Sequence, residues 1–301
     1  MQDNSGDLEK AIDAITKSYN GPDAINNLKS AALPNRRAVI DAFEHIAPMI
    51  YMGFYATRPL SQENLRYSVS EHAYPAYEQL CQQISRAITY EQNCERMMQK
   101  GDEFAHRATM KLFCCMPELR KMLNEDVVAA FSNDPAARSV EEVIFSYPTL
   151  EAITAYRVAH ILYKAGVPMI PRIISEYAHS RTGIDIHPAA IVGRRLFIDH
   201  GTGVVIGETA QLGDDVKLYQ GVTLGALSTK RVPHHNNSRC EKRHPTLENN
   251  VTIYAGATIL GGETTIGEGS IIGGNMWLVR SVPPHSKIFG GPRTETKEDE
   301  T

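Results

Sequence analysis

Two residues in the second half of the chain, His200 and Asp185, have the types and spacing of a general base and its orienting carboxylate. Histidine is the usual proton acceptor near neutral pH. A neighbouring aspartate can fix its tautomer and stabilise the imidazolium, as in a triad without its own nucleophile. Asp185 precedes His200 by 15 residues, which in a solenoid of about 18 residues per coil leaves them on neighbouring faces of successive coils. An isolated histidine on such a fold is otherwise a satisfied surface side chain.

A basic arm at residues 226–243 could cover an anionic ligand. Its charged residues are five cations and one acid: Lys230, Arg231, Arg239, Lys242, Arg243 and Glu241. A solvated loop is the simpler interpretation. A loop that interrupts a regular repeat disturbs the stacking, however, and this favours a functional flap.

The repeat that the arm interrupts has a period of six residues and begins near residue 184. Two apolar series follow this period: Ile186, Val192, Ile198, Val204, Ala210, Val216, Val222, and then Ile206, Leu212, Leu218, Leu224. The pattern resumes at Val251 and runs to Leu278. A short strand plus a turn fits this period, and three such units close one coil of a triangular prism. Seventeen of the 22 glycines follow residue 180, as corners with positive φ require, and an inserted Gly-Thr pair beside His200 distorts the pattern.

The chain before the repeat has helical periodicity. Val39, Phe43, Ile46 and Ile50 form one apolar stripe at spacings of 4, 3 and 4. Asp134 precedes a proline, which is typical of a turn or a helix-start cap.

We therefore predict three parts. These are a helical N-terminal domain at residues 1–181, a parallel β-helix at 182–292 with the extended loop 226–243, and a polar tail at 293–301. The β-helix stabilises its coils collectively, because each coil buries its apolar residues only against the next.

The composition excludes several classes of protein. A formal charge of −4 argues against a general binder of nucleic acid or of acidic membranes. No apolar run approaches the ~18 residues of a membrane span, and the first residues lack the basic and apolar regions of a signal peptide. The five cysteines form no CxxC pair, so we expect reduced thiols and a cytoplasmic protein.

Ordered motifs in this chain resemble those of the serine O-acetyltransferases, a family of hexapeptide-repeat acyltransferases. The matching segments are IDIHPAA at 184–190, DHGTGVVIGETA at 199–210, VTLG at 222–225, RHP at 243–245, SVPP at 281–284, DPA at 134–136 and AYR at 155–157. The resemblance implies an α+β fold with segregated parts, in which the β-helix is left-handed, an exception to the right-handed crossover rule. It also implies homotrimers, often doubled to hexamers through the helical domains.

The resemblance further implies transfer of acetyl from acetyl-CoA to the hydroxyl of L-serine, the first step of cysteine biosynthesis. A hydroxyl is a weak nucleophile, so the family's His–Asp dyad, here His200 and Asp185, would deprotonate it during direct attack on the thioester. The resemblance implies that Asp134 and Asp199 bind the ammonium group of serine. Arg243 suits its carboxylate by bidentate hydrogen bonds.

His244 would lie beside the substrate near the developing oxyanion. The site would lie between neighbouring subunits, and cysteine, which has the shape of serine, would compete there as a feedback inhibitor.

The acetyl-CoA groove of the family maps to Gly225, Ala255 and Gly274, where small side chains allow close backbone approach. No metal is expected. The candidates for the phosphates of CoA remain open: Lys230, Arg231, Arg280 and Lys287.

The last residues are polar and lack the terminal isoleucine with which many members bind O-acetylserine sulfhydrylase, which puts that complex in doubt. Other hypotheses are a hexapeptide O-acetyltransferase for a sugar or a xenobiotic, and a non-enzymatic scaffold. A metal-dependent γ-type carbonic anhydrase needs three converging histidines. Its possible ligands do not have the required spacing: His200, His234, His235 and His244.

Overall fold

The structure is a computed structural model, and the chain separates into two compact units, Met1–Leu33 and Pro34–Thr301. In the first unit, helix α1 (Ser5–Ser18) has an apolar stripe with Leu8 and Ile15 exposed. The structure describes residues 5–21, 25–28, 33–56, 58–91, 98–227 and 241–290. Most of the predicted arm and the whole predicted tail therefore lie outside the described residues.

The described part of the second unit begins with six helices. They are α2 (Arg36–Ile50), α3 (Gln62–Glu91), α4 (Met98–Asn133), α5 (Val140–Ser146), α6 (Pro148–Lys164) and α7 (Ile170–Thr182). The Asn35 side chain caps α2 by accepting from the N–H groups of Arg37 and Ala38, and Gly183 ends α7 in a left-handed conformation with φ 71°. The apolar stripe predicted in this region lies buried on α2, which confirms it. None of the helices in the described residues combines the length and the apolar character needed to cross a membrane.

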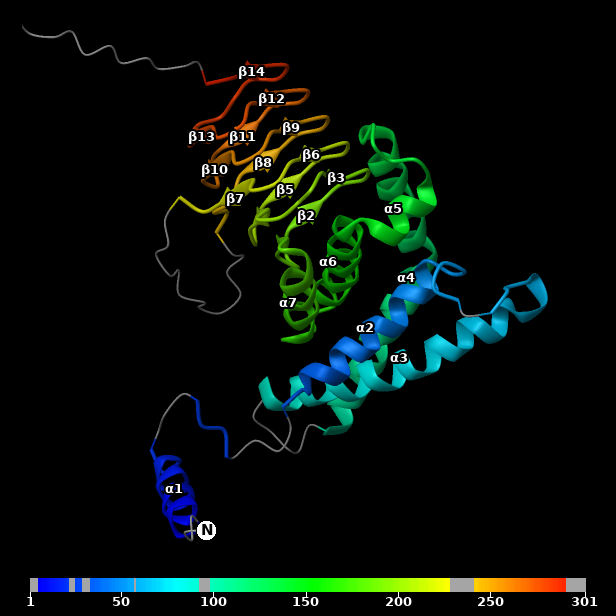
Figure 1. Ribbon diagram of the computed structural model, residues 1–301, viewed down its shortest axis with the longest axis vertical. Coiled ribbons are helices and arrows are strands. Elements are labelled where there is room, and N and C mark those ends of the chain that lie inside the picture. Colours follow the sequence, from blue (N-terminus) through cyan, green and yellow to red (C-terminus); the bar gives the residue numbers. More distant parts are fainter. Residues whose placement is uncertain are drawn as a thin grey trace, which may run out of the picture. The chain divides into compact units, whose positions relative to one another are not determined.

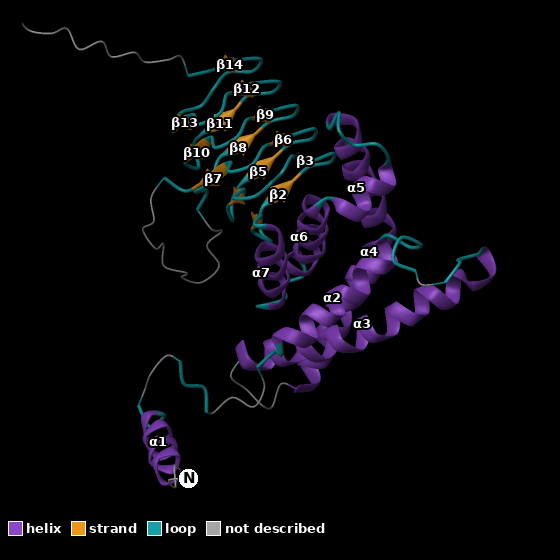
Figure 2. Cartoon of the chain, viewed as in Figure 1, coloured by secondary structure: helices purple, strands orange, loops and turns teal. Residues whose placement is uncertain are grey.

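The chain then forms a parallel β-solenoid of two- and three-residue strands. The strands are β1 (Asp185–Ile186), β2 (Ile191–Val192), β3 (Phe197–Ile198), β4 (Val205–Ile206), β5 (Gln211–Leu212), β6 (Lys217–Leu218), β7 (Thr223–Gly225), β8 (Thr246–Leu247), β9 (Thr252–Ile253), β10 (Thr258–Leu260), β11 (Thr265–Ile266), β12 (Ile271–Ile272), β13 (Trp277–Leu278) and β14 (Lys287–Ile288). They form three sheets, ordered β1-β4-β7-β10-β13, β11-β8-β5-β2 and β14-β12-β9-β6-β3. Figures 1 and 2 show the coils stacked from β2 and β3, beside α6, to β14. About five turns of this kind are consistent with the predicted left-handed β-helix.

The register shows where the solenoid departs from regularity. Val205 pairs with Thr223, 18 residues later, but Asp185 pairs with Val205, 20 residues later. The two additional residues of the first coil lie in the corner between β3 and β4. The predicted distortion beside His200 is thus confirmed. A further step of 35 residues, from Thr223 to Thr258, contains the arm.

Both predicted apolar series point into the prism. All members of the second series are buried, and Val192 is the one member of the first series that is only half-buried. The buried set is continuous from Val39 of α2 to Val282 near the last coil, so helices and solenoid share one hydrophobic core. The last helix ends at Thr182 and the first strand begins at Asp185.

A buried ion pair joins α4 and α6 to the first coil. Arg157 donates to both carboxylate oxygens of Asp126 at 2.7 and 2.8 Å and to the carbonyl of Gly193 at 2.9 Å. Asp126 also accepts from the Leu196 N–H at 3.0 Å. Arg157 of the AYR motif thus binds Asp126, and among the described contacts it has none with Asp134.

Candidate active site

His200 lies on a prism corner that the two additional residues enlarge. This corner, residues 199–204, joins β3 to β4, and the backbone of His200 is left-handed with φ 57°. The His200 side chain is 72% exposed, and its Nδ1 atom lies 3.9 Å from Oδ1 of Asp199. The insertion therefore presents an accessible imidazole beside a carboxylate, as a base acting on a bound substrate requires.

Asp134 reaches the same corner from the end of α4. One of its carboxylate oxygens accepts from the N–H of Ala136 at 2.8 Å, and the other accepts from the hydroxyl of Tyr147. The Tyr147 hydrogen bond, then the Ala136 N–H and the charge of His200, lower the pKa of Asp134. We call Asp134, Tyr147, Asp199 and His200 the histidine corner. Its two carboxylates suit an ammonium group.

Arg243 and His244 lie at a different corner, where residues 207–210 join β4 to β5. The Arg243 guanidinium pairs with the carboxylate of Glu208. The backbone N–H groups of Arg243 and His244 both donate to Oγ1 of Thr209, at 2.8 and 3.0 Å. We call Glu208, Thr209, Arg243 and His244 the arginine corner.

The protonation of His244 follows from its contacts. Burial, together with the nearby charge of Arg243, lowers the pKa of His244 to about 4, so the ring is neutral near neutral pH. Its Nδ1 atom accepts from the Thr209 N–H at 3.1 Å, and a backbone N–H can only donate. The ring proton therefore sits on Nε2, which leaves His244 a neutral hydrogen-bond donor.

A glycine makes room for this ring. A Cβ atom added to Gly207 would lie 2.0 Å from Cδ2 and 2.2 Å from Nε2 of His244. The glycine after β4 is therefore a steric requirement of the arginine corner.

The predicted site residues are thus divided between two corners of one chain. The two-residue strand β4 separates the corners, and at ~3.3 Å per residue the step from Val204 to Gly207 spans about 10 Å.

Asp185 pairs in register with Val205 of β4, the strand between the two corners. Its carboxylate lies within 4.8 Å of side-chain atoms of Glu176 and His179 on α7, a group whose donors could hold a cation. Among the described contacts, no hydrogen bond or ion pair joins Asp185 to His200. Their predicted pairing is not formed in the single chain and stays a prediction.

The predicted acetyl-CoA positions follow the same division. Ala255 and Gly274 lie in successive coils on the stack of corners that includes His200, and the Asn275 N–H donates to the carbonyl of Ala255 at 2.9 Å. Gly225 ends β7, on the stack of corners that includes Gly207. The role of all three in binding CoA stays a prediction.

Lys242 does not serve the anion-binding role suggested by its place in the arm. Its ammonium donates to the carbonyls of Thr209, His244 and Pro245 at 2.8, 2.5 and 3.2 Å. Burial lowers its pKa. Through these three hydrogen bonds, Lys242 attaches the end of the arm to the solenoid. Five other predicted candidates lie outside the described residues: Lys230, Arg231, His234, His235 and Arg239.

Four contact residues of the two corners had not been predicted from the sequence. Glu208 and Thr209 lie within the 199–210 motif, so their position in it was an available signal. Tyr147 and Tyr219 had no such signal. Burial, and then the charges of Tyr254, Asp199 and Asp134, raise the pKa of Tyr219, which places it beside the histidine corner.

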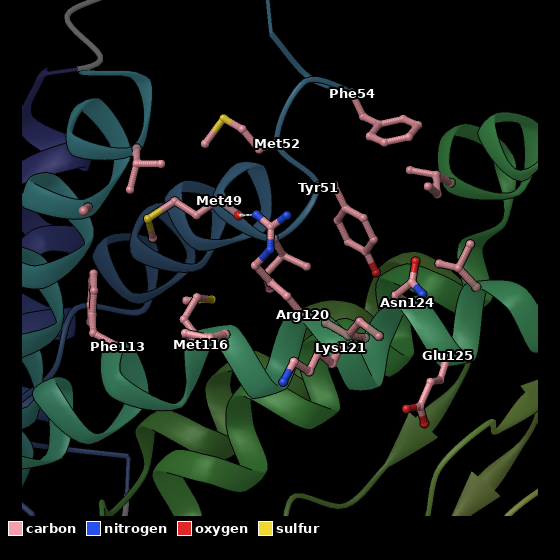
Figure 3. Close-up of a pocket in the computed structure, with 17 residues that line it drawn as sticks. Met49, Tyr51, Met52, Phe54, Phe113, Met116, Arg120, Lys121, Asn124 and Glu125 are labelled. Atoms are coloured by element: carbon pink, nitrogen blue, oxygen red, sulfur yellow. Dashed lines mark hydrogen bonds between the residues drawn. The ribbon is translucent and has the colours of Figure 1, made fainter. Parts of the chain in front are cut away.

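A separate cavity of about 880 Å³ lies among the helices (Figure 3). Its apolar lining includes Met49, Met52 and Met116, and Arg120 donates to the carbonyl of Met49 at 2.8 Å. The described residues that line it include no predicted site residue. We therefore locate the chemistry at the prism corners.

Comparisons with known proteins agree on one family. A scan against models of protein families gives no match. A curated relative, "Serine acetyltransferase, plasmid" of Synechococcus elongatus, is 39% identical over 287 residues, which cover 93% of this chain and 90% of the relative.

Solved structures give the same result. Serine acetyltransferase isoform 3 of Entamoeba histolytica, in complex with cysteine, superposes with a TM-score of 0.71 and 32% identity, covering 98% of this chain and 96% of that one. Serine acetyltransferase of Neisseria gonorrhoeae, in complex with serine, has a TM-score of 0.54 and 27% identity, covering 84% and 96%.

Proposed function

Because this chain belongs to the serine acetyltransferase family, we propose the reaction and the roles of its residues as follows. The protein is a serine O-acetyltransferase that transfers acetyl from acetyl-CoA to L-serine and yields O-acetyl-L-serine and CoA. The observation that carries this function is 39% identity to a serine acetyltransferase over nine-tenths of both chains.

We propose that His200 is the general base. An imidazole nitrogen takes the proton of the serine hydroxyl as the oxygen attacks the thioester carbon, the C–S bond breaks, and the imidazolium returns the proton to the CoA thiolate. The exposure of His200 and its place beside two carboxylates support this role. We keep Asp185 as its orienting carboxylate, which requires rotation of the His200 side chain or a contribution from a second subunit.

We propose that the acceptor binds between subunits. Asp134 and Asp199 of the histidine corner would take the ammonium of serine, while Arg243 of a neighbouring chain would take its carboxylate. His244 of that neighbour would donate from Nε2 to the developing oxyanion. The separation of about 10 Å along the backbone between the corners supports a shared site, because a serine molecule is shorter than this distance.

The remaining partners follow from this arrangement. Acetyl-CoA would lie along the prism past Gly225, Ala255 and Gly274, and the proposed steps use side chains without a metal ion. Cysteine would compete with serine for the same corners, in line with the cysteine bound to the Entamoeba histolytica relative.

We also propose a cytoplasmic location, supported by three unpaired cysteines in the described residues: Cys81, Cys114 and Cys115.

The function is tested by release of free thiol from acetyl-CoA. We expect release that depends on L-serine, and metal analysis of the active protein should find no stoichiometric metal. Release with sugars or chloramphenicol but not with serine would instead favour the other O-acetyltransferases, and a stoichiometric metal would support the hydratase hypothesis.

The shared site is tested by mixing His200→Ala and Arg243→Ala subunits after co-refolding or co-expression. In trimers assembled at random, each mixed trimer contains one site with both corners intact, so about a quarter of the wild-type activity should return. Each variant alone should remain nearly inactive. No recovery in proven mixed trimers would mean that each site is built within one chain.

A further inference from the structure

Tyr147 is placed firmly beside the histidine corner. It is the residue before α6, and its backbone N–H donates to the carbonyl of Val143 at 3.2 Å, while its own carbonyl accepts from the Leu150 N–H at 3.1 Å. Its ring packs on a small core that includes Val143, Leu150 and Phe197. The hydroxyl therefore has little freedom in direction, because both backbone and ring are fixed.

The hydroxyl of Tyr147 holds one oxygen of Asp134, and the Ala136 N–H holds the other at 2.8 Å. A carboxylate has about four acceptor positions, so two remain available after these bonds. The two donors come from different segments, one from the turn after α4 and one from the residue that precedes α6. Together they fix the plane of the Asp134 carboxylate.

We propose that Tyr147 is a positioning residue for the acceptor: its hydroxyl holds the carboxylate of Asp134 so that the free oxygen positions face the ammonium of serine. This inference rests on the proposed function, because it specifies how the same site recognises an α-ammonium group. Tyr147 itself touches Asp134 and need not touch the reacting atoms.

The charges around Tyr147 suit this role. The hydrogen bond to Asp134 and burial raise the pKa of Tyr147 to about 12, with a further contribution from Asp199. The hydroxyl thus keeps its proton and remains a donor throughout the working range of pH. In turn, the Tyr147 hydrogen bond is the largest of the causes that lower the pKa of Asp134 and so keep it ionised.

The test is Tyr147→Phe in the full-length protein, compared with Tyr51→Phe. The control also loses a hydroxyl hydrogen bond in the helical region, between Tyr51 and Thr154 at 2.8 Å, but Tyr51 has no described contact with Asp134. We expect Tyr147→Phe to raise the KM for L-serine about tenfold, with kcat and the KM for acetyl-CoA within about twofold of wild type. The control should leave all three constants within about twofold.

A double-mutant cycle separates positioning from a general effect on the fold. In an Asp134→Asn background, the same tyrosine substitution should change the KM for serine less than about twofold, since the two residues act as one unit.

Unchanged serine kinetics in Tyr147→Phe would overturn the positioning role, as would equal effects with and without the Asp134 carboxylate. Equal damage to the constants for serine and acetyl-CoA, matched by Tyr51→Phe, would also overturn it in favour of a structural role. A wild-type protein without serine-dependent thiol release would refute the proposed function, and the positioning role would fall with it.

Discussion

Replacement of His244 by asparagine should remove part of the acid sensitivity of the fold. The Oδ1 atom of asparagine can occupy the place of Nδ1 and accept from the Thr209 N–H, which now donates at 3.1 Å. The variant keeps this contact but carries no titrating group. Any difference from wild type in the pH dependence of stability then reports the protonation of this one ring.

The size of the effect follows from the two pKa values of His244. The unfolded chain has the ordinary value of 6.5, and the folded protein lowers it to about 4, so the unfolded state binds the proton more tightly. Stability is fully present above about pH 6.5 and is lost as pH falls towards 4. Linkage gives a loss of about 2 kcal/mol at pH 5 and less than about 0.2 kcal/mol at pH 7.5.

The assay is urea unfolding at fixed protein concentration, at pH 7.5 and pH 5, for wild type and His244→Asn. The fall in unfolding free energy between the two pH values should be about 2 kcal/mol smaller in the variant. His200→Asn is the matched control, because that ring is 72% exposed and the same substitution there should change the fall much less than His244→Asn does. Equal falls in wild type and His244→Asn would refute the claim that the fold holds this ring neutral.

Three further predictions concern the core and the corners. Gly207→Ala should lower kcat/KM for serine at least about tenfold with the circular dichroism retained, because its Cβ would meet the His244 ring at 2.0 Å; wild-type kinetics would show that the ring is free to move. Asp126→Asn should lower the unfolding free energy by about 3–5 kcal/mol, since it leaves the buried Arg157 unpaired, and a second change of Arg157 to Met should recover part of that loss; additive losses would contradict this. His200→Ala should lose most turnover while light scattering detects the same oligomer as wild type, and near-full activity would exclude His200 as the base.

The solenoid could be predicted from the sequence because its repeat is short and recurs between neighbouring coils. Residues such as Ile206 and Leu224 recur at a fixed step, and each is buried by the same residue types one coil away. The irregular first coil was equally readable at Gly201 and Thr202, since an insertion in a repeat breaks a pattern that the neighbouring coils define.

The contacts within the two corners could not be predicted from the repeat, because they join residues whose positions in the sequence follow no common period. Tyr147 and Asp134 belong to different helical elements, and Arg243 meets Glu208 across the 35-residue step of the arm. The separation between the corners was also hidden, since it depends on which end of a short strand each residue follows. The order of the motifs in the sequence indicated which residues are candidates for the site, but not that they lie at two separate corners of the prism.

The enlarged corner that presents His200 has a consequence for how such a protein can change over time. The ladder pairs before and after the corner, such as Ile198 with Leu218 and Ile206 with Leu224, do not involve its two additional residues. Removal of Gly201 and Thr202 would give this coil the spacing of the later coils and leave those pairs in place, while it would change the corner from which the imidazole projects. The stacking of the coils and the position of the proposed base therefore depend on different residues.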